Sequence, residues 1–191
     1  IVPDRPGFGL STFKPNRQVL DWPDDVEQLA ISLEVDRYAI FGLSGGAPHV
    51  AAVAHRNPDK LTGAAIVSGV APPEMPNRLR GMWPPIRLIF FTAKHALWLN
   101  RLILAQMGSF YANEERMRGQ MVRALPEPDV ELISRRPEII EIFSAAAQEA
   151  HRNGIDGDAW EWRLYNHPWG FKLSEIPIEI GLWYGKYDRN A

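Results

Sequence analysis

Apolar positions in the first seventy residues follow first a helical and then a strand-like spacing, and the two alternate. Residues 22–33 carry apolar side chains three and four positions apart, which predicts an amphipathic helix capped by Asp21. A short apolar run over 38–41 predicts a strand, 46–56 a helix, and 62–68 a second buried strand. Strands connected through a helix pair in parallel, so the pattern predicts an α/β fold built on a mainly parallel sheet.

The alternation stops after Gly69 and resumes only at the apolar run 178–184, which predicts a further strand. The residues between these points show helical patterns over 86–107, 114–125, 137–153 and 157–165. We therefore predict a helical insertion between two sheet strands. The predicted organisation is a first part of the core over 1–70, an inserted helical region over 71–175, and a return to the core over 176–191.

Composition narrows the class of protein. The chain has 191 residues, of which 46% are hydrophobic, so it can bury a substantial core as one domain with an insertion. A formal net charge of −2 without long like-charge blocks gives no footprint for nucleic acid. The chain has no cysteine, which excludes disulfides and thiolate metal sites. No targeting segment is visible, and we expect a cytoplasmic location.

Candidate chemistry lies at the junction between the strand 38–41 and the helix that follows it. Gly42-Leu43-Ser44-Gly45-Gly46 matches the G-x-S-x-G pattern in the strand–turn–helix context which that pattern requires. In such a turn the serine adopts a strained conformation that exposes its hydroxyl, and small neighbours, Gly42 and Gly46, are needed where backbone segments approach closely. The N–H of Gly45 can then donate to a developing oxyanion.

The same glycine-rich turn is also compatible with tight packing alone, or with a loop that cradles a phosphate. A dinucleotide-binding fingerprint has a glycine where Ser44 stands, and a P-loop ends in Gly-Lys-Ser/Thr, which is absent here. The context therefore favours a nucleophilic serine.

Three segments together carry a family resemblance: DRPGFGLS over 4–11, FGLSGGAPHVAAVAHRNPDKLTGAAIVSGVAPP over 41–73, and LWYGKYD over 182–188. The chain resembles the α/β-hydrolase superfamily, in the branch with a helical cap. The resemblance implies a partial α/β-hydrolase fold with a cap over 71–175. It also implies Ser44 as the nucleophile, Gly45 as a donor of the oxyanion hole, and Asp188 as the acid of a catalytic triad.

The chemistry of such a serine requires two partners. A histidine must remove the proton from the hydroxyl, and a carboxylate must orient that histidine; the chain order in this fold is serine, acid, histidine. All five histidines precede Asp188, and we interpret them as structural or surface residues, with a cap histidine acting as the base left as an alternative. Ile1 and Val2 look like the end of a strand. We therefore expect a fragment that lacks N-terminal strands and the catalytic histidine, and that is inactive alone.

Two functions from different classes follow. The first is a serine hydrolase that cleaves an ester-type or related acyl bond without cofactor or metal, on a small-molecule substrate with an apolar moiety. The second is a non-catalytic α/β-hydrolase-like binding protein or inactive remnant. Epoxide and haloalkane chemistry are disfavoured, because by the resemblance those branches attack with an aspartate where Ser44 stands.

The segment 84–107 is intensely apolar but carries Arg87, Lys94 and Arg101 every seven residues, so a continuous helix would place them on one face. These charges argue against a membrane-spanning helix. Peripheral contact with a membrane surface, or lining the mouth of an acyl pocket, are alternatives to the favoured interpretation, a cap helix that buries its apolar side.

Overall fold

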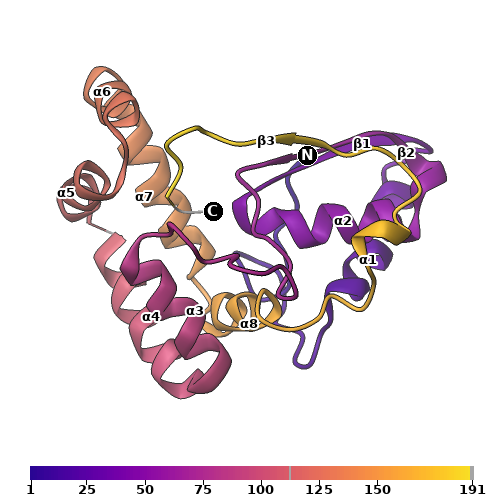
Figure 1. Cartoon of the computed structure of the whole chain (residues 1–191), viewed down its shortest axis with the longest axis horizontal. Helices are drawn as coiled ribbons and strands as arrows, with labels where there is room; N and C mark the ends of the chain where they lie inside the picture. Colours follow the sequence, from indigo (N-terminus) through magenta and orange to yellow (C-terminus); the bar gives the residue numbers. More distant parts are fainter. Residues whose placement is uncertain (112, 190–191) are drawn as a thin grey trace. The chain divides into compact units, whose positions relative to one another are not determined.

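The computed structural model describes residues 1–111 and 113–189 and contains a parallel three-stranded sheet in the order β1-β2-β3 (Figure 1). Its strands are β1 (Tyr38–Leu43), β2 (Leu61–Val67) and β3 (Gly181–Trp183). At the carboxyl ends Leu43 pairs with Val67, and Val67 pairs with Trp183. The turns that follow the three strands therefore leave from the same edge of the sheet, and the predicted α/β class with a parallel sheet is confirmed.

Two helices cover one face of this sheet, α1 (Trp22–Ser32) and α2 (Ala47–Arg56), joined to their neighbours by 3₁₀ turns at Val19–Asp21, Ser44–Gly46 and Pro58–Lys60. Helix α2 tolerates Pro48 in its first turn, where the missing N–H has no helical partner, and ends at Asn57 before Pro58. Its buried side is made of small and β-branched residues that pack against Leu61 and Ile66 of β2. Small residues let the helix approach the sheet closely, which fixes the position of its first turn.

The helical region contains α3 (Pro84–His95), α4 (Leu97–Tyr111), α5 (Glu114–Ala124), α6 (Glu127–Arg135), α7 (Glu138–Ala150) and α8 (Asp156–Leu164). Two apolar clusters hold it together. One joins Ile89, Leu104 and Ala159, and the other joins Met117, Ile133 and Ile140. In the described part of the chain, no helix has both the length and the hydropathy that crossing a membrane requires.

The continuous helix expected over 86–107 is wrong, because the chain breaks at Ala96 between α3 and α4. Buried polar groups define this corner. The Asn100 side chain, fully buried, donates to the carbonyl of Ile89 at 3.2 Å and to the Thr92 hydroxyl at 3.1 Å. A buried amide must find such partners, and α4 folds back on α3 to supply them. Arg101 therefore lies on a different helix from Arg87 and Lys94.

The described residues form two compact units with boundaries that differ from the predicted ones. One unit joins residues 1–15 to 83–163, and the other joins 16–82 to 164–191, which contains the sheet. Residues 1–15 belong with the helices because the Gly9 N–H donates to the Ala150 carbonyl at 3.2 Å and the Asn153 side chain donates to the Gly9 carbonyl at 2.7 Å. The predicted strand end at Ile1-Val2 is wrong, since residues 1–5 form no regular element. The cap over 71–175 stays a prediction.

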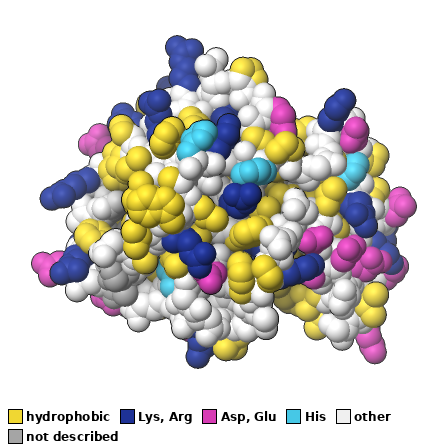
Figure 2. All heavy atoms as spheres, turned by 90° about the horizontal axis from the view of Figure 1, so that it is seen from below, with side chains coloured by type: hydrophobic (Ala, Val, Ile, Leu, Met, Phe, Trp, Pro, Cys, Tyr) yellow, Lys and Arg dark blue, Asp and Glu magenta, His cyan; other side chains and the backbone are white. Residues whose placement is uncertain are grey.

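Hydrophobic side chains are abundant on the surface, and Figure 2 shows them interspersed with charged side chains over one face of the molecule. In the sheet unit, Phe41 and Leu43 of β1 are mostly exposed, as is Trp183 of β3. Along β1, exposed positions alternate with positions that pack on α1 and α2. The sheet therefore presents large apolar side chains on the face opposite these two helices.

Candidate functional site

Ser44 sits on the turn between β1 and α2 with a φ of 50°, a conformation that non-glycine residues rarely adopt. Such a conformation costs on the order of 1–3 kcal/mol and persists only where the surroundings enforce it. Ser44 is exposed, and it begins the 3₁₀ turn that leads directly into α2. The strain therefore holds a serine hydroxyl in solvent at the N-terminal end of a helix.

Gly42 is required by packing. A Cβ built on Gly42 would lie 2.8 Å from the carbonyl carbon and oxygen of Gly46 and 2.8 Å from Cγ2 of Val50. No real Cβ sits so close to backbone, because neither α2 nor β1 can move away without losing its packing. The structure thus explains why the sequence needs a small residue at 42.

The sequence also predicts that residue 46 must be small, and the structure differs from that prediction. Gly46 has a φ of −73°, which is ordinary helical backbone, and a Cβ built there would meet nothing within 4 Å among the described residues beyond its chain neighbours. The prediction that close backbone approach demands a glycine at 46 is therefore wrong. Gly46 is the last residue of the 3₁₀ turn and directly precedes α2.

Gly45 is crowded by a side chain that sequence reasoning missed. The Tyr165 hydroxyl occupies the space where a Cβ of Gly45 would stand, and its ring carbon Cζ would lie 2.7 Å from that Cβ. Tyr165 is 6% exposed. Its backbone is held by Arg78, which donates to the Tyr165 carbonyl at 2.9 Å and to the Asn166 side chain at 2.6 Å. Burial lowers the pKa of the Arg78 guanidinium, and Glu74 opposes that shift.

The turn after β2 is hydrogen-bonded to the turn after β1. The Val70 N–H donates to the Ser44 carbonyl at 3.1 Å, which links the segment after β2 to the residue after β1. Ser68, directly after β2, also has a positive φ, of 46°. Its N–H donates to the Trp183 carbonyl at 2.8 Å, and the Tyr184 hydroxyl donates to the Gly69 carbonyl at 3.0 Å. These bonds fix the carboxyl edge of the sheet around Ser44.

Asp188 lies beyond the same edge. It follows β3 through a turn in which its N–H donates to the Gly185 carbonyl at 3.1 Å, and its side chain is half-buried. Strand β2 stands between β1 and β3. The structure thus places Ser44 in one turn with Gly42, Gly45 and Gly46. It places Asp188 after β3, which is separated from β1 by β2, at the same edge of the sheet.

Four of the histidines take part in ring contacts or a hydrogen bond, among them His95, whose ring centroid lies 4.8 Å from that of Phe91. His49 is 3% exposed and lies edge-on to Trp22, with ring centroids 5.7 Å apart, while His55 stacks on Phe171 at 4.7 Å. In the helical unit, His151 Nε2 lies 3.3 Å from a carboxylate oxygen of Asp158. The hydrogen bond to Asp158 raises the pKa of His151 against the opposing effect of burial. These contacts agree with a structural role for His49, His55 and His151.

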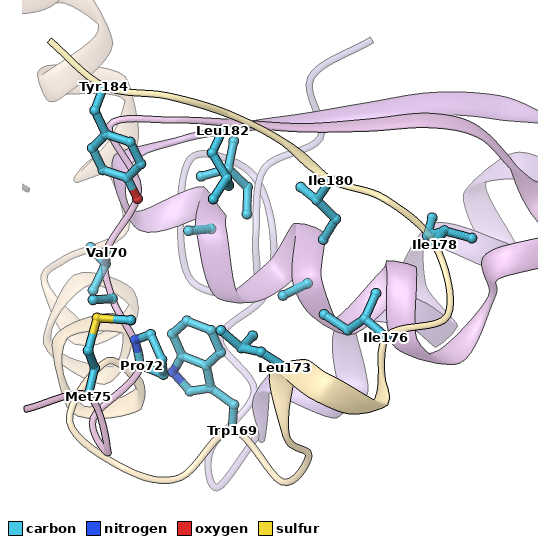
Figure 3. Close-up of a pocket in the computed structure, with 14 residues that line it drawn as sticks. Val70, Pro72, Met75, Trp169, Leu173, Ile176, Ile178, Ile180, Leu182 and Tyr184 are labelled. Carbon is cyan, nitrogen blue, oxygen red and sulfur yellow. The ribbon is translucent and has the colours of Figure 1, made fainter.

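A cavity of about 320 Å³ lies alongside the first turns of α2 in the sheet unit. Figure 3 shows alternate side chains of the segment leading into β3 projecting toward α2, with Trp169 on the opposite side. Trp169 is 5% exposed, and within the described residues its indole N–H has no hydrogen-bond acceptor. The lining is otherwise almost wholly apolar: Ala47, Ala51, Ile66, Val70, Ala71, Pro72, Met75, Leu173, Ile176, Ile178, Ile180, Leu182 and Tyr184.

The lining suits an apolar group. The described part of the chain holds no cluster of three His, Asp or Glu side chains that could bind a metal ion.

Comparison with known proteins bears on most of the chain. A family model described as alpha/beta hydrolase fold matches residues 1–170, a range that includes the serine turn and the helical region. No curated protein matches the chain.

Proposed function

The chain belongs to the α/β-hydrolase fold family, whose members are mostly hydrolytic enzymes, and we propose that it acts there as a serine hydrolase. One observation carries the proposal: the exposed Ser44, held at a φ of 50° on a strand-to-helix turn. A serine in that position can approach a substrate carbonyl from the end of the sheet while the chain behind it stays fixed.

In the proposed reaction the Ser44 hydroxyl oxygen attacks an ester-type carbonyl carbon. A histidine takes the hydroxyl proton and then gives it to the leaving alcohol, and water releases the acid from the acyl-enzyme in a second, equivalent step. The Gly45 N–H, at the positive end of α2, donates to the oxyanion. No cofactor or metal enters these steps.

Asp188 is the proposed acid that orients the histidine. Its support is its position after β3, on the sheet edge that also carries Ser44. We place the histidine after Asp188 in chain order, because the fold's order is serine, acid, histidine.

The proposed substrate is a small molecule with an apolar moiety. The apolar cavity beside α2 supports this proposal, because Ala47 in its wall follows the serine turn directly and Val70 in its wall bonds the Ser44 carbonyl.

Tyr165 is the side chain that we add to this site. Its hydroxyl lies against Gly45, and the nitrogen and Cα of that residue are only about 1.5 Å apart. The phenol therefore stands beside the N–H proposed to bind the oxyanion, where it helps to position the substrate carbonyl.

The test is covalent labelling of the natural protein with a fluorophosphonate, which traps an activated serine. We expect one adduct, located on Ser44 by peptide mass spectrometry, and none in a Ser44→Ala variant. Ser68→Ala is the matched control, since Ser68 has a similar φ but its turn leads into no helix N-terminus; it should label like the wild type. Absence of labelling in the folded natural protein would favour the non-catalytic binding protein instead.

A further inference from the structure

Helices α3 and α4 expose large apolar side chains. Leu88 and Phe91 of α3 are 51% and 60% exposed, and Trp98 and Leu102 of α4 are 68% and 58% exposed. The expectation that this segment buries its apolar side is therefore only partly right, because a different set of residues, Ile89, Phe90, Ala93 and Leu104, makes the core contacts. A patch of exposed apolar side chains on two packed helices is typical of an interaction site for a protein, a membrane or a ligand.

The segment that carries these side chains has charges of one sign. From Trp83 to Asn113 the sequence contains no Asp or Glu, while it contains Arg87, Lys94 and Arg101. Arg101 forms an ion pair with Asp156 of α8. Arg87 and Lys94 are exposed, and within the described residues neither is paired with a carboxylate.

Apolar and basic positions share the exposed side of each helix. At 100° per residue, Phe91 lies between Leu88 on one flank and Arg87 and Lys94 on the other. The same geometry on α4 puts Trp98 between Leu102 and Arg101. Helix α3 thus presents an apolar ridge with Arg87 and Lys94 along one border, while the cation beside the α4 ridge, Arg101, is paired with Asp156. Long basic side chains placed as on α3 can reach toward headgroups while the ridge enters the bilayer boundary.

The two helices that carry these ridges are held together as one preformed unit. The buried Asn100 side chain of α4 donates to the Ile89 carbonyl and to the Thr92 hydroxyl of α3, so the helix pair is held rigidly at its corner. A preformed surface loses little conformational entropy on binding.

We propose that the α3–α4 face, formed by Leu88, Phe91, Trp98 and Leu102 with Arg87 and Lys94, binds the surface of an anionic lipid bilayer. Phe91 and Trp98 enter the interface, and the cations contact acidic headgroups. This inference does not depend on the proposed hydrolase activity, and its test needs no substrate.

Helix α7 supplies a control within the chain. It exposes Ile142 and Phe143 to 64% and 50%, much as α3 exposes its apolar pair. However, α7 carries Glu138, Glu141 and Glu149 and no basic residue. Adhesion driven by exposed apolar area alone would involve both helices, whereas binding to an anionic bilayer should involve only the α3–α4 face.

The experiment uses the absence of cysteine from the chain. Phe91→Cys and Phe143→Cys each introduce one thiol, which is labelled with the environment-sensitive fluorophore NBD. With phosphatidylserine-containing vesicles we expect a severalfold rise in emission from position 91 and none from position 143, and phosphatidylcholine vesicles should leave both unchanged. High salt should reverse the rise at 91.

Variants then test the two components of the face. Lys94→Gln should lower the partition coefficient onto the acidic vesicles about fivefold, and Trp98→Ala about tenfold, with circular dichroism showing native helix content in each. Three results would overturn the proposal: no emission change at 91 in the folded protein, equal changes at 91 and 143, or a change at 91 with monomeric apolar esters but not with vesicles. The last would assign the face to substrate contact.

Discussion

The turn after β1 and the turn after β2 have nearly the same backbone but different surroundings. Ser44 and Ser68 each follow the last residue of a strand, with φ values of 50° and 46°. Ser44 is exposed and begins the 3₁₀ turn that leads into α2, whereas the Ser68 N–H is bonded to the Trp183 carbonyl and the chain continues into irregular turns. A strained serine therefore marks a sharp turn; only the helix that follows the Ser44 turn adds the electrostatics of a nucleophile site.

The residues around each serine repeat this contrast. In the sheet register Gly42 pairs with Ile66, so β1 has a glycine where β2 has a buried isoleucine. Each turn also meets a tyrosine. The Tyr184 hydroxyl donates to the Gly69 carbonyl, while the Tyr165 hydroxyl lies against Gly45. The first turn is shaped by the helix behind it, and the second by hydrogen bonds to β3.

The largest expected effect is that of Gly42→Ala. The new methyl would meet the Gly46 backbone and Val50, so we expect the free energy of unfolding to fall by about 3 kcal/mol. Gly46→Ala is the matched control: its Cβ enters open space at a helical φ, and stability should rise by up to about 1 kcal/mol. Chemical denaturation measures both. Equal losses at the two positions would contradict the difference we describe between the glycines.

The next largest effect is expected from Tyr165→Phe, which removes only the hydroxyl beside Gly45. For hydrolysis of an apolar ester by the natural protein we expect kcat to fall about tenfold with KM unchanged, a loss of about 1.4 kcal/mol of transition-state stabilisation. Tyr184→Phe should instead lower the free energy of unfolding by about 1 kcal/mol, because it removes the bond to Gly69. Wild-type kcat in Tyr165→Phe, together with a lower melting temperature, would show that the phenol only packs.

The smallest effect is expected from relieving the strain. Ser44→Gly and Ser68→Gly each remove the cost of a positive φ but gain entropy in the unfolded chain, so each should stabilise by about 0.5 kcal/mol. Thermal unfolding measures this change. Fluorophosphonate labelling should disappear in Ser44→Gly and persist in Ser68→Gly. Destabilisation by Ser44→Gly alone would mean that the Ser44 hydroxyl makes stabilising contacts, contrary to a strained, exposed serine.

Local signals predicted the sheet unit well. The helix end at Asn57-Pro58, the strands β1 and β2, and the strand–turn–helix around Ser44 follow from proline, glycine and apolar spacing, which act within a few residues. The same reasoning failed at Ala96. Periodicity continues across that residue, and the break depends on a buried amide, Asn100, finding acceptors on the preceding helix.

The sequence by itself determined the family, the α/β class and the turn that carries Ser44, because glycine, proline and apolar spacing constrain the backbone locally. Only the tertiary structure decided that Gly46, unlike Gly42, has open space beside it, that Tyr165 stands over Gly45, and that residues 1–15 join the helices. The last two depend on atoms far apart in the chain. Close packing brings such atoms together, and no short-range pattern in the sequence records where they will meet.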